Sequence, residues 1–149
     1  MYDNKFEIFV ESSKDGDRIV VVGDVGENSE INFKYFEKQI SDTCFVDLEN
    51  IKTVNSIGLA KIIKLLGVIN DRTVFVEYCP ESLMTTVMTL PQLKNVHIKS
   101  FKSTLECAKC LSDSETVVEV VDGIEQTPNK FCSDCGEKLN LLTSLNHDF

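Results

Sequence analysis

The sequence lacks the features that mark membrane and secreted proteins. It has no apolar run that approaches the roughly 18 residues needed to cross a bilayer, and its charged start, MYDNKFE, does not resemble a signal peptide. We therefore expect a cytoplasmic protein with no membrane partner. In that compartment the six cysteines of the chain are better suited to metal binding or to free thiols than to disulfides.

Positive charge is scarce, with 15 Lys and Arg against 24 Asp and Glu and a net charge of -9. The deficit is uneven, because residues 1–102 hold 12 basic and 15 acidic residues, whereas residues 103–149 hold 3 and 9. Such an acidic C-terminal part repels phosphate backbones, which argues against nucleic acid as a partner. The length of 149 residues leaves room for one domain of about 100 residues and an appendage.

Residues that could support catalysis are few. The only two histidines, His97 and His147, have no carboxylate or cysteine at ligand spacing. Asp47 and Glu49 alternate with apolar residues of one expected strand, and an acid–base pair there would need a pocket that the sequence does not indicate. We therefore expect no enzymatic activity.

Apolar periodicity predicts alternating strands and helices. Strands are expected at residues 5–12 and 18–22, joined by a turn at Asp15-Gly16. Further strands are expected at 44–48, 73–78 and 95–101, and helices at 29–40, at 57–69 and between Pro80 and Pro91. This order predicts an α/β fold, a mixed sheet with helices packed on it. Cys44 lies in one of these expected strands and is interpreted as a core residue. Cys79 precedes Pro80 and is interpreted as a helix cap.

The stretch Cys44–Leu66, CFVDLENIKTVNSIGLAKIIKLL, predicts a buried strand, a polar turn and an amphipathic helix. Ser56 stands where a helix N-cap is expected, with a hydroxyl that can accept from unpaired backbone N–H groups. A strand that leads into a capped helix places this hydroxyl at the carboxyl end of a sheet, where open α/β folds bind ligands and partners.

This stretch resembles the signature of the STAS domain, the fold of anti-sigma-factor antagonists, in which a hydrophobic strand is followed by Asp-Ser-Ser/Thr-Gly-Leu and a helix. Val46-Asp47-Leu48 matches the strand, Ser56 the first serine, and Gly58-Leu59 the Gly-Leu pair. Asn55 replaces the usual Asp, and Ile57 replaces the second Ser or Thr. The resemblance extends over about residues 5–102 in the order of elements, without the usual last helix.

The resemblance implies a non-enzymatic signalling module that binds a protein partner through Asn55, Ser56, Ile57, Gly58 and Leu59. The partner would be an anti-sigma factor or a kinase-like regulator, and phosphorylation of Ser56 would switch the binding. The alternative is a constitutive scaffold in which Ser56 is only a helix cap and the C-terminal segment is the interaction surface. A homodimer is left open.

The C-terminal segment, residues 103–149, contains two Cys-x-x-Cys pairs: Cys107, Cys110, Cys132 and Cys135. Four thiolates can surround one metal ion in tetrahedral geometry, so the segment predicts a small β zinc ribbon, which the turn at Asp122-Gly123 favours. A structural zinc ion, worth on the order of 10–16 kcal/mol, would allow so short a segment to fold. Iron in the same site, a redox dithiol and disulfides are the alternatives.

Overall fold

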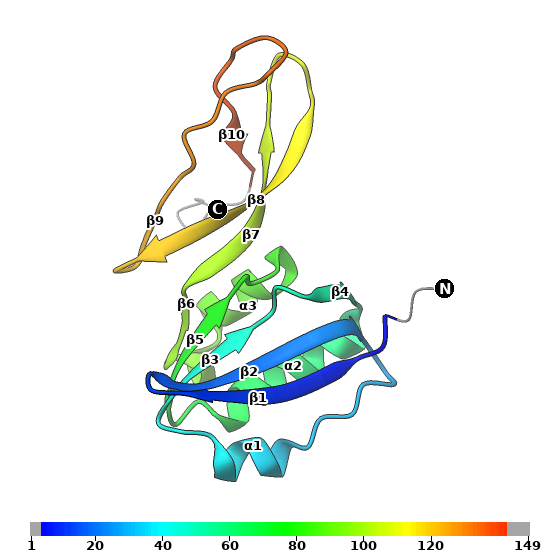
Figure 1. Cartoon of the computed structure of the whole chain (residues 1–149), viewed down its shortest axis with the longest axis vertical. Helices are drawn as coiled ribbons and strands as arrows, with labels where there is room; N and C mark the ends of the chain where they lie inside the picture. The colour runs from blue at the N-terminus through cyan, green and yellow to red at the C-terminus, as the bar shows by residue number, and fades with distance from the viewer. Residues whose placement is uncertain (1–3, 143–149) are drawn as a thin grey trace.

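The computed structural model describes residues 4–142, which form an α/β body and a β-ribbon that extends from it (Figure 1). The main sheet has the order β1-β2-β3-β5-β6. β1 (Glu7–Ser13) pairs antiparallel with β2 (Gly16–Val25), and parallel pairing then continues through β3 (Thr43–Asp47), β5 (Thr73–Glu77) and β6 (Val96–Ile98).

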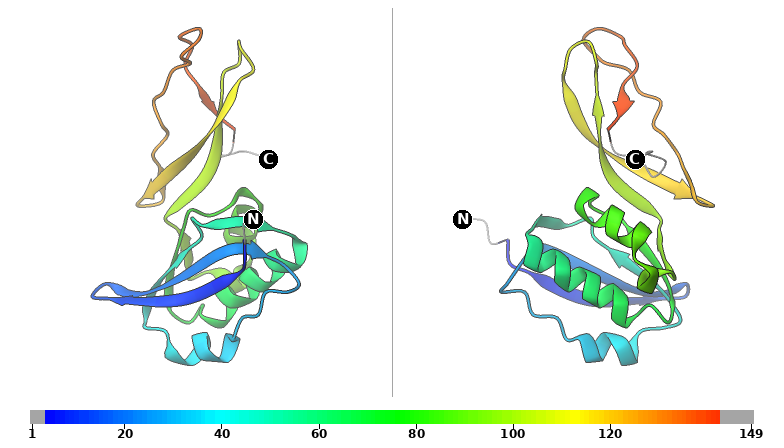
Figure 2. Two further views of the ribbon diagram at one scale, coloured as in Figure 1. Left: turned by 45° about the vertical axis from the view of Figure 1, so that its right-hand side comes forward. Right: turned by 180° about the vertical axis from the view of Figure 1, so that it is seen from behind.

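The helices α1 (Phe33–Gln39), α2 (Ser56–Val68) and α3 (Glu81–Thr89) alternate with these strands, and a short 3-10 helix, η1 (Pro91–Leu93), follows α3. Successive parallel strands are neighbours, so right-handed crossovers place the helices on one side of the sheet. Figure 2 shows α2 and α3 on that face. The predicted α/β class is confirmed, and the predicted helices and strands follow in the predicted order, with β4 in addition and the last strand divided into two. No helix within residues 4–142 is long and apolar enough to cross a membrane.

One strand of the main sheet was not predicted. The segment expected to be a polar turn contains β4 (Ile51–Val54), which pairs in parallel with the end of β2, Val54 lying opposite Val25. The Asn55 N–H then donates to the Val25 carbonyl over 3.2 Å. β4 therefore leads the chain from the end of β3 to the C-terminal end of β2, and this pairing fixes where α2 begins.

The core lies between the helices and the sheet. Strand residues alternate as expected, so that Cys44 and Val46 point into the core while Phe45 lies on the open face. Helical spacing over residues 57–69 predicts a buried stripe of Leu59, Ile62, Ile63, Leu66 and Ile69. Of these, Ile62 and Leu66 of α2 and Ile69 at its C-cap are buried. Leu65 joins them, whereas the predicted core residues Leu59 and Ile63 are only half-buried. The helix therefore faces the sheet with a stripe rotated slightly from the predicted one.

A second sheet forms the β-ribbon, with the order β10-β7-β8-β9. Its strands are β7 (Ser100–Glu106), β8 (Asp113–Val121), β9 (Ile124–Glu125) and β10 (Asn140–Leu141). The single strand expected at 95–101 is in fact β6 followed by β7, and residue 102, the expected end of the first domain, lies within β7. Phe101 and Val118, which are cross-strand partners, belong to the core of the α/β body.

Candidate functional site

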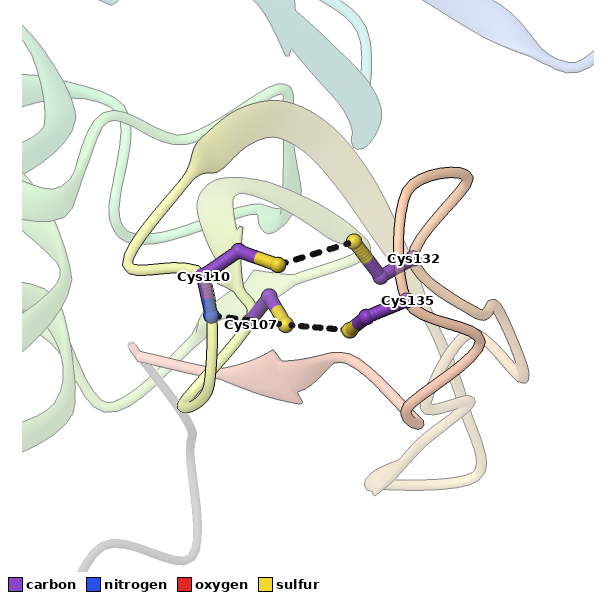
Figure 3. Close-up of side chains that lie close together, drawn as sticks. All are labelled: Cys107, Cys110, Cys132 and Cys135. Carbon is purple, nitrogen blue, oxygen red and sulfur yellow. Dashed lines mark hydrogen bonds between the residues drawn. The ribbon is translucent and has the colours of Figure 1, made fainter.

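Four cysteines from the two Cys-x-x-Cys pairs meet at the far end of the β-ribbon (Figure 3). Their Sγ atoms all lie within 4.8 Å of one another. The Cys107 and Cys135 sulfurs are 3.4 Å apart, and those of Cys110 and Cys132 are 4.0 Å apart. The structure thus brings together all four residues that the sequence predicts as metal ligands.

The two pairs lie in turns with the same hydrogen bonds. In the first turn the Leu111 N–H donates to the Cys107 carbonyl over 2.8 Å, and in the second the Gly136 N–H donates to the Cys132 carbonyl over 2.9 Å. The Cys107 N–H donates to the Ser112 carbonyl and the Cys132 N–H to that of Glu137. The residue that follows the second cysteine has a positive φ in both turns, 59° at Leu111 and 77° at Gly136.

This shared backbone conformation suits glycine and strains leucine. The left-handed conformation destabilises a residue with a Cβ atom by about 1–2 kcal/mol. Glycine avoids this strain, but its larger loss of backbone entropy on folding costs about 0.5–1 kcal/mol of free energy. Leu111→Gly is therefore expected to raise the free energy of unfolding by about 0.5–1 kcal/mol, in urea unfolding of the metal-bound chain. The Leu111 side chain is 75% exposed, so little packing is lost.

The matched variant is Gly136→Ala, which adds a Cβ atom to the same conformation in open space. It should lower the free energy of unfolding by a similar amount. A loss of stability in Leu111→Gly would contradict this account of the two turns.

The geometry and the donors of the cysteine cluster suit one tetrahedral metal ion. Zinc–sulfur bonds of about 2.3 Å place tetrahedral sulfurs about 3.8 Å apart, which lies between the two measured separations of 3.4 and 4.0 Å. Backbone N–H groups of Asp134 and Cys135 donate to the Cys132 sulfur and lower its pKa to about 7. Hydrogen bonding to Cys135 raises the pKa of Cys110 to about 12. Metal binding must therefore release thiol protons, and it weakens as the pH falls.

The other cysteines and the histidines lie away from this cluster. Cys44 and Cys79 are fully buried in the α/β core, where burial raises their pKa values to about 11 and about 12. The N-cap of α3 is Pro80, which corrects the interpretation of Cys79 as a cap. His97 is exposed beside Phe75 on the open face of the sheet, and His147 lies outside the described residues.

At the start of α2 the N-cap is Asn55, which corrects the interpretation of Ser56 as the cap. The Asn55 Oδ1 atom accepts from the Gly58 N–H over 2.8 Å, and its Nδ2 atom donates to Glu27 Oε2 over 2.9 Å. An aspartate would keep the first bond, but it could not donate to the Glu27 carboxylate. The asparagine that departs from the STAS signature therefore has its own structural reason, and the Ser56 hydroxyl is not needed for capping.

The five residues predicted as a partner-binding surface divide into two groups. Asn55, Ser56 and Ile57 are exposed, Ile57 by 50%. Gly58 is buried against the Val25 carbonyl, and Leu59 is half-buried. Gly58 and Leu59 therefore hold α2 in place, and the exposed group alone could touch a partner.

A lysine on α2 fastens the neighbouring loop to this surface. The Lys61 ammonium donates to the carbonyls of Gly26, Glu27 and Ser29 over 2.8, 3.0 and 2.6 Å. Its position opposite the apolar stripe of the helix predicts a solvated side chain, and no local signal reveals its role, because the bonded residues are 32–35 positions apart. Beside this loop lies an open cleft of about 840 Å³, lined by residues 4–8, 24–30 and 53–55.

Comparison with protein-family models found no match to this chain, and no curated protein matches it. The STAS resemblance therefore stays a prediction drawn from the signature around Ser56 and from the order of elements. What the structure adds is a cysteine cluster that could hold a metal ion, within a mixed α/β fold.

Proposed function

We propose that the chain is a non-enzymatic signalling module that binds a protein partner through the start of α2, with a structural zinc ion in the cysteine cluster. The observation that carries the proposal is the exposure of Asn55, Ser56 and Ile57 at a rigid corner of the fold. The corner is rigid because Asn55 caps the helix and Lys61 ties the adjacent loop to it. By resemblance, the partner is an anti-sigma factor or a related kinase-like regulator.

Phosphorylation of Ser56 is the proposed switch. Ser56 is the first residue of α2 and is exposed, and a helix N-terminus tolerates the -1.5 to -2 charge of a phosphate well. Glu27 already places one carboxylate against Asn55. A phosphate beside it makes the corner strongly negative and bulky, so a partner that presents carboxylates there dissociates while the fold is unchanged.

In this proposal the metal ion of the cysteine cluster has a structural role. With four protein ligands the ion has no open position for substrate, which favours a structural role over a catalytic one. Zinc suits four thiolates in tetrahedral geometry, although iron accepts the same ligands. Metal analysis of the purified chain should find about one equivalent of zinc, and a folded ribbon with no bound metal would contradict this part.

The test of the docking surface is affinity capture from native lysate with the wild-type chain and Ser56→Asp side by side. We expect a partner that the wild type retains and the variant loses, with the melting temperature changed by no more than about 2 °C. The matched control is Ser82→Asp, because Ser82 is also an exposed serine in the first turn of a helix. Capture of the same partners by wild type and Ser56→Asp would contradict the switch and favour a constitutive scaffold.

A further inference from the structure

One face of the β-ribbon exposes apolar side chains among carboxylates. Strand alternation places Asp113, Glu115, Val117, Glu119 and Val121 of β8 on this face. Ile124 of β9 lies opposite Val121 on the same face. The exposed fractions of Val121 and Ile124 are 54% and 63%, and that of Val117 is 39%. We call these six residues the acidic ribbon face.

The charge of this face is uncompensated. Within residues 4–142, none of Asp113, Glu115 and Glu119 forms an ion pair. One neighbouring cation is Lys102, the cross-strand partner of Val117, and its ammonium donates to the carbonyls of Leu48 and Glu49 over 3.5 and 3.1 Å. Another is Lys99 at the Val121 end of β8, whose ammonium lies 3.9 Å from Glu77. Lys102 therefore joins the ribbon to the α/β body and does not neutralise the carboxylates of β8.

Carboxylates at the end of β3 lie near the β8 end of this face. The carboxylate of Glu49 raises the pKa of Tyr78, with smaller contributions from burial and from Asp47 and Glu119, while the Arg18 guanidinium opposes the shift. Glu119 thus shares one electrostatic environment with the end of β3. The nine residues of β8 span about 30 Å.

We propose that the acidic ribbon face is a second docking surface, separate from the start of α2, and that it binds a basic amphipathic segment of a partner protein. Apolar side chains of that segment would cover Val117, Val121 and Ile124, while its Lys and Arg side chains would meet the carboxylates of β8. Charge complementarity selects this occupant. A second copy of the chain, nucleic acid or an anionic membrane would each bring like charge to the same face.

The probe is a synthetic 20-residue helical peptide of Leu and Lys, whose length of about 30 Å matches β8. Its leucines are placed along one helix face. A peptide of the same composition in shuffled order and one with Glu in place of Lys are the controls. Binding to the full-length, zinc-bound chain is measured by calorimetry at 50 and 300 mM salt. The bound region is mapped by amide hydrogen exchange.

Two sets of variants localise the peptide. Glu115→Lys with Glu119→Lys should weaken binding about tenfold or more, whereas Glu30→Lys with Glu37→Lys makes the same charge change at exposed sites outside this face and should have little effect. Val121→Ser should weaken binding severalfold. Its control is Ile57→Ser, which alters a comparably exposed residue at the start of α2 and should leave the peptide affinity unchanged.

The proposal predicts salt-sensitive binding of the amphipathic Lys peptide alone, with amide protection in residues 117–124. Absence of binding at 50 mM salt, equal binding of the shuffled peptide, or equal loss in the Glu30 and Glu37 variant would overturn it. Self-association of the free chain that buries this face in sedimentation and hydrogen exchange would also overturn it, since a second copy would then be the occupant. The start of α2 is untouched by these results, because its own test uses Ser56→Asp.

Discussion

Cys132→Ser is expected to abolish stoichiometric zinc binding and to unfold the end of the β-ribbon that carries the two cysteine turns, whereas Phe101 and Val118 stay in the core of the α/β body. Each of the two turns supplies two of the four sulfurs, and within residues 119–142 Cys132 is the one buried residue. A bound zinc ion would therefore provide most of the stabilisation of this part, on the order of 10–16 kcal/mol. Metal analysis and hydrogen exchange over residues 103–142 measure the two effects.

The control for this variant is Cys79→Ala, which removes a thiol from the α/β core and not from the cluster. It should keep one equivalent of zinc and destabilise the chain only by the loss of a small buried group. The α/β body of Cys132→Ser should stay folded, because its core is built mainly from β2, β3, β5 and the helices. A ribbon that keeps its amide protection after Cys132→Ser would show that the metal is not what holds it together.

Gly58→Ala is expected to lower the free energy of unfolding by about 3 kcal/mol. A Cβ atom at this position would lie 2.1 Å from the Val25 carbonyl oxygen and 2.9 Å from the Gly26 backbone nitrogen. Both neighbours are backbone atoms, so either α2 or the end of β2 must move. Urea unfolding measures the loss, and weaker partner capture should accompany it, because the same contact positions Ser56.

The same helix offers a matched control at Gly67, where an added Cβ atom would meet nothing within 4 Å. Gly67→Ala should therefore stabilise the chain by about 0.4–1 kcal/mol, since alanine loses less backbone entropy in a helix. Two variants with the same chemical change on one helix should thus differ in sign. A neutral Gly58→Ala would contradict the close approach of α2 to β2.

Local patterns were sufficient to predict the α/β class and the composition of the cysteine cluster. The apolar run of Phe45, Val46 and Leu48 predicts a strand without any knowledge of its partners. The spacing within each Cys-x-x-Cys pair likewise predicts two ligands for one metal ion. β4 escaped prediction because four residues, IKTV, become a strand only by pairing with β2, which is distant in sequence. Short strands depend on such tertiary pairing more than on propensity.

The sequence alone does not show which residue is the N-cap of α2. Asn55 and Ser56 are about equally good N-cap residues, and the choice falls to Asn55 because β4 fixes its backbone against Val25. The bond from Asn55 to Glu27 and the three bonds from Lys61 span about 30 residues. Hydrogen bonds between residues so far apart leave no periodic pattern in the sequence.

The most direct test of the proposed docking surface is the hydrogen-exchange footprint of the captured partner on the wild-type chain. We expect protection at residues 55–62 and in the adjacent loop, residues 26–29, and the loss of that protection in Ser56→Asp. Protection confined to the β-ribbon, with residues 55–62 exchanging as in the free chain, would contradict the assignment of the start of α2 as the docking surface.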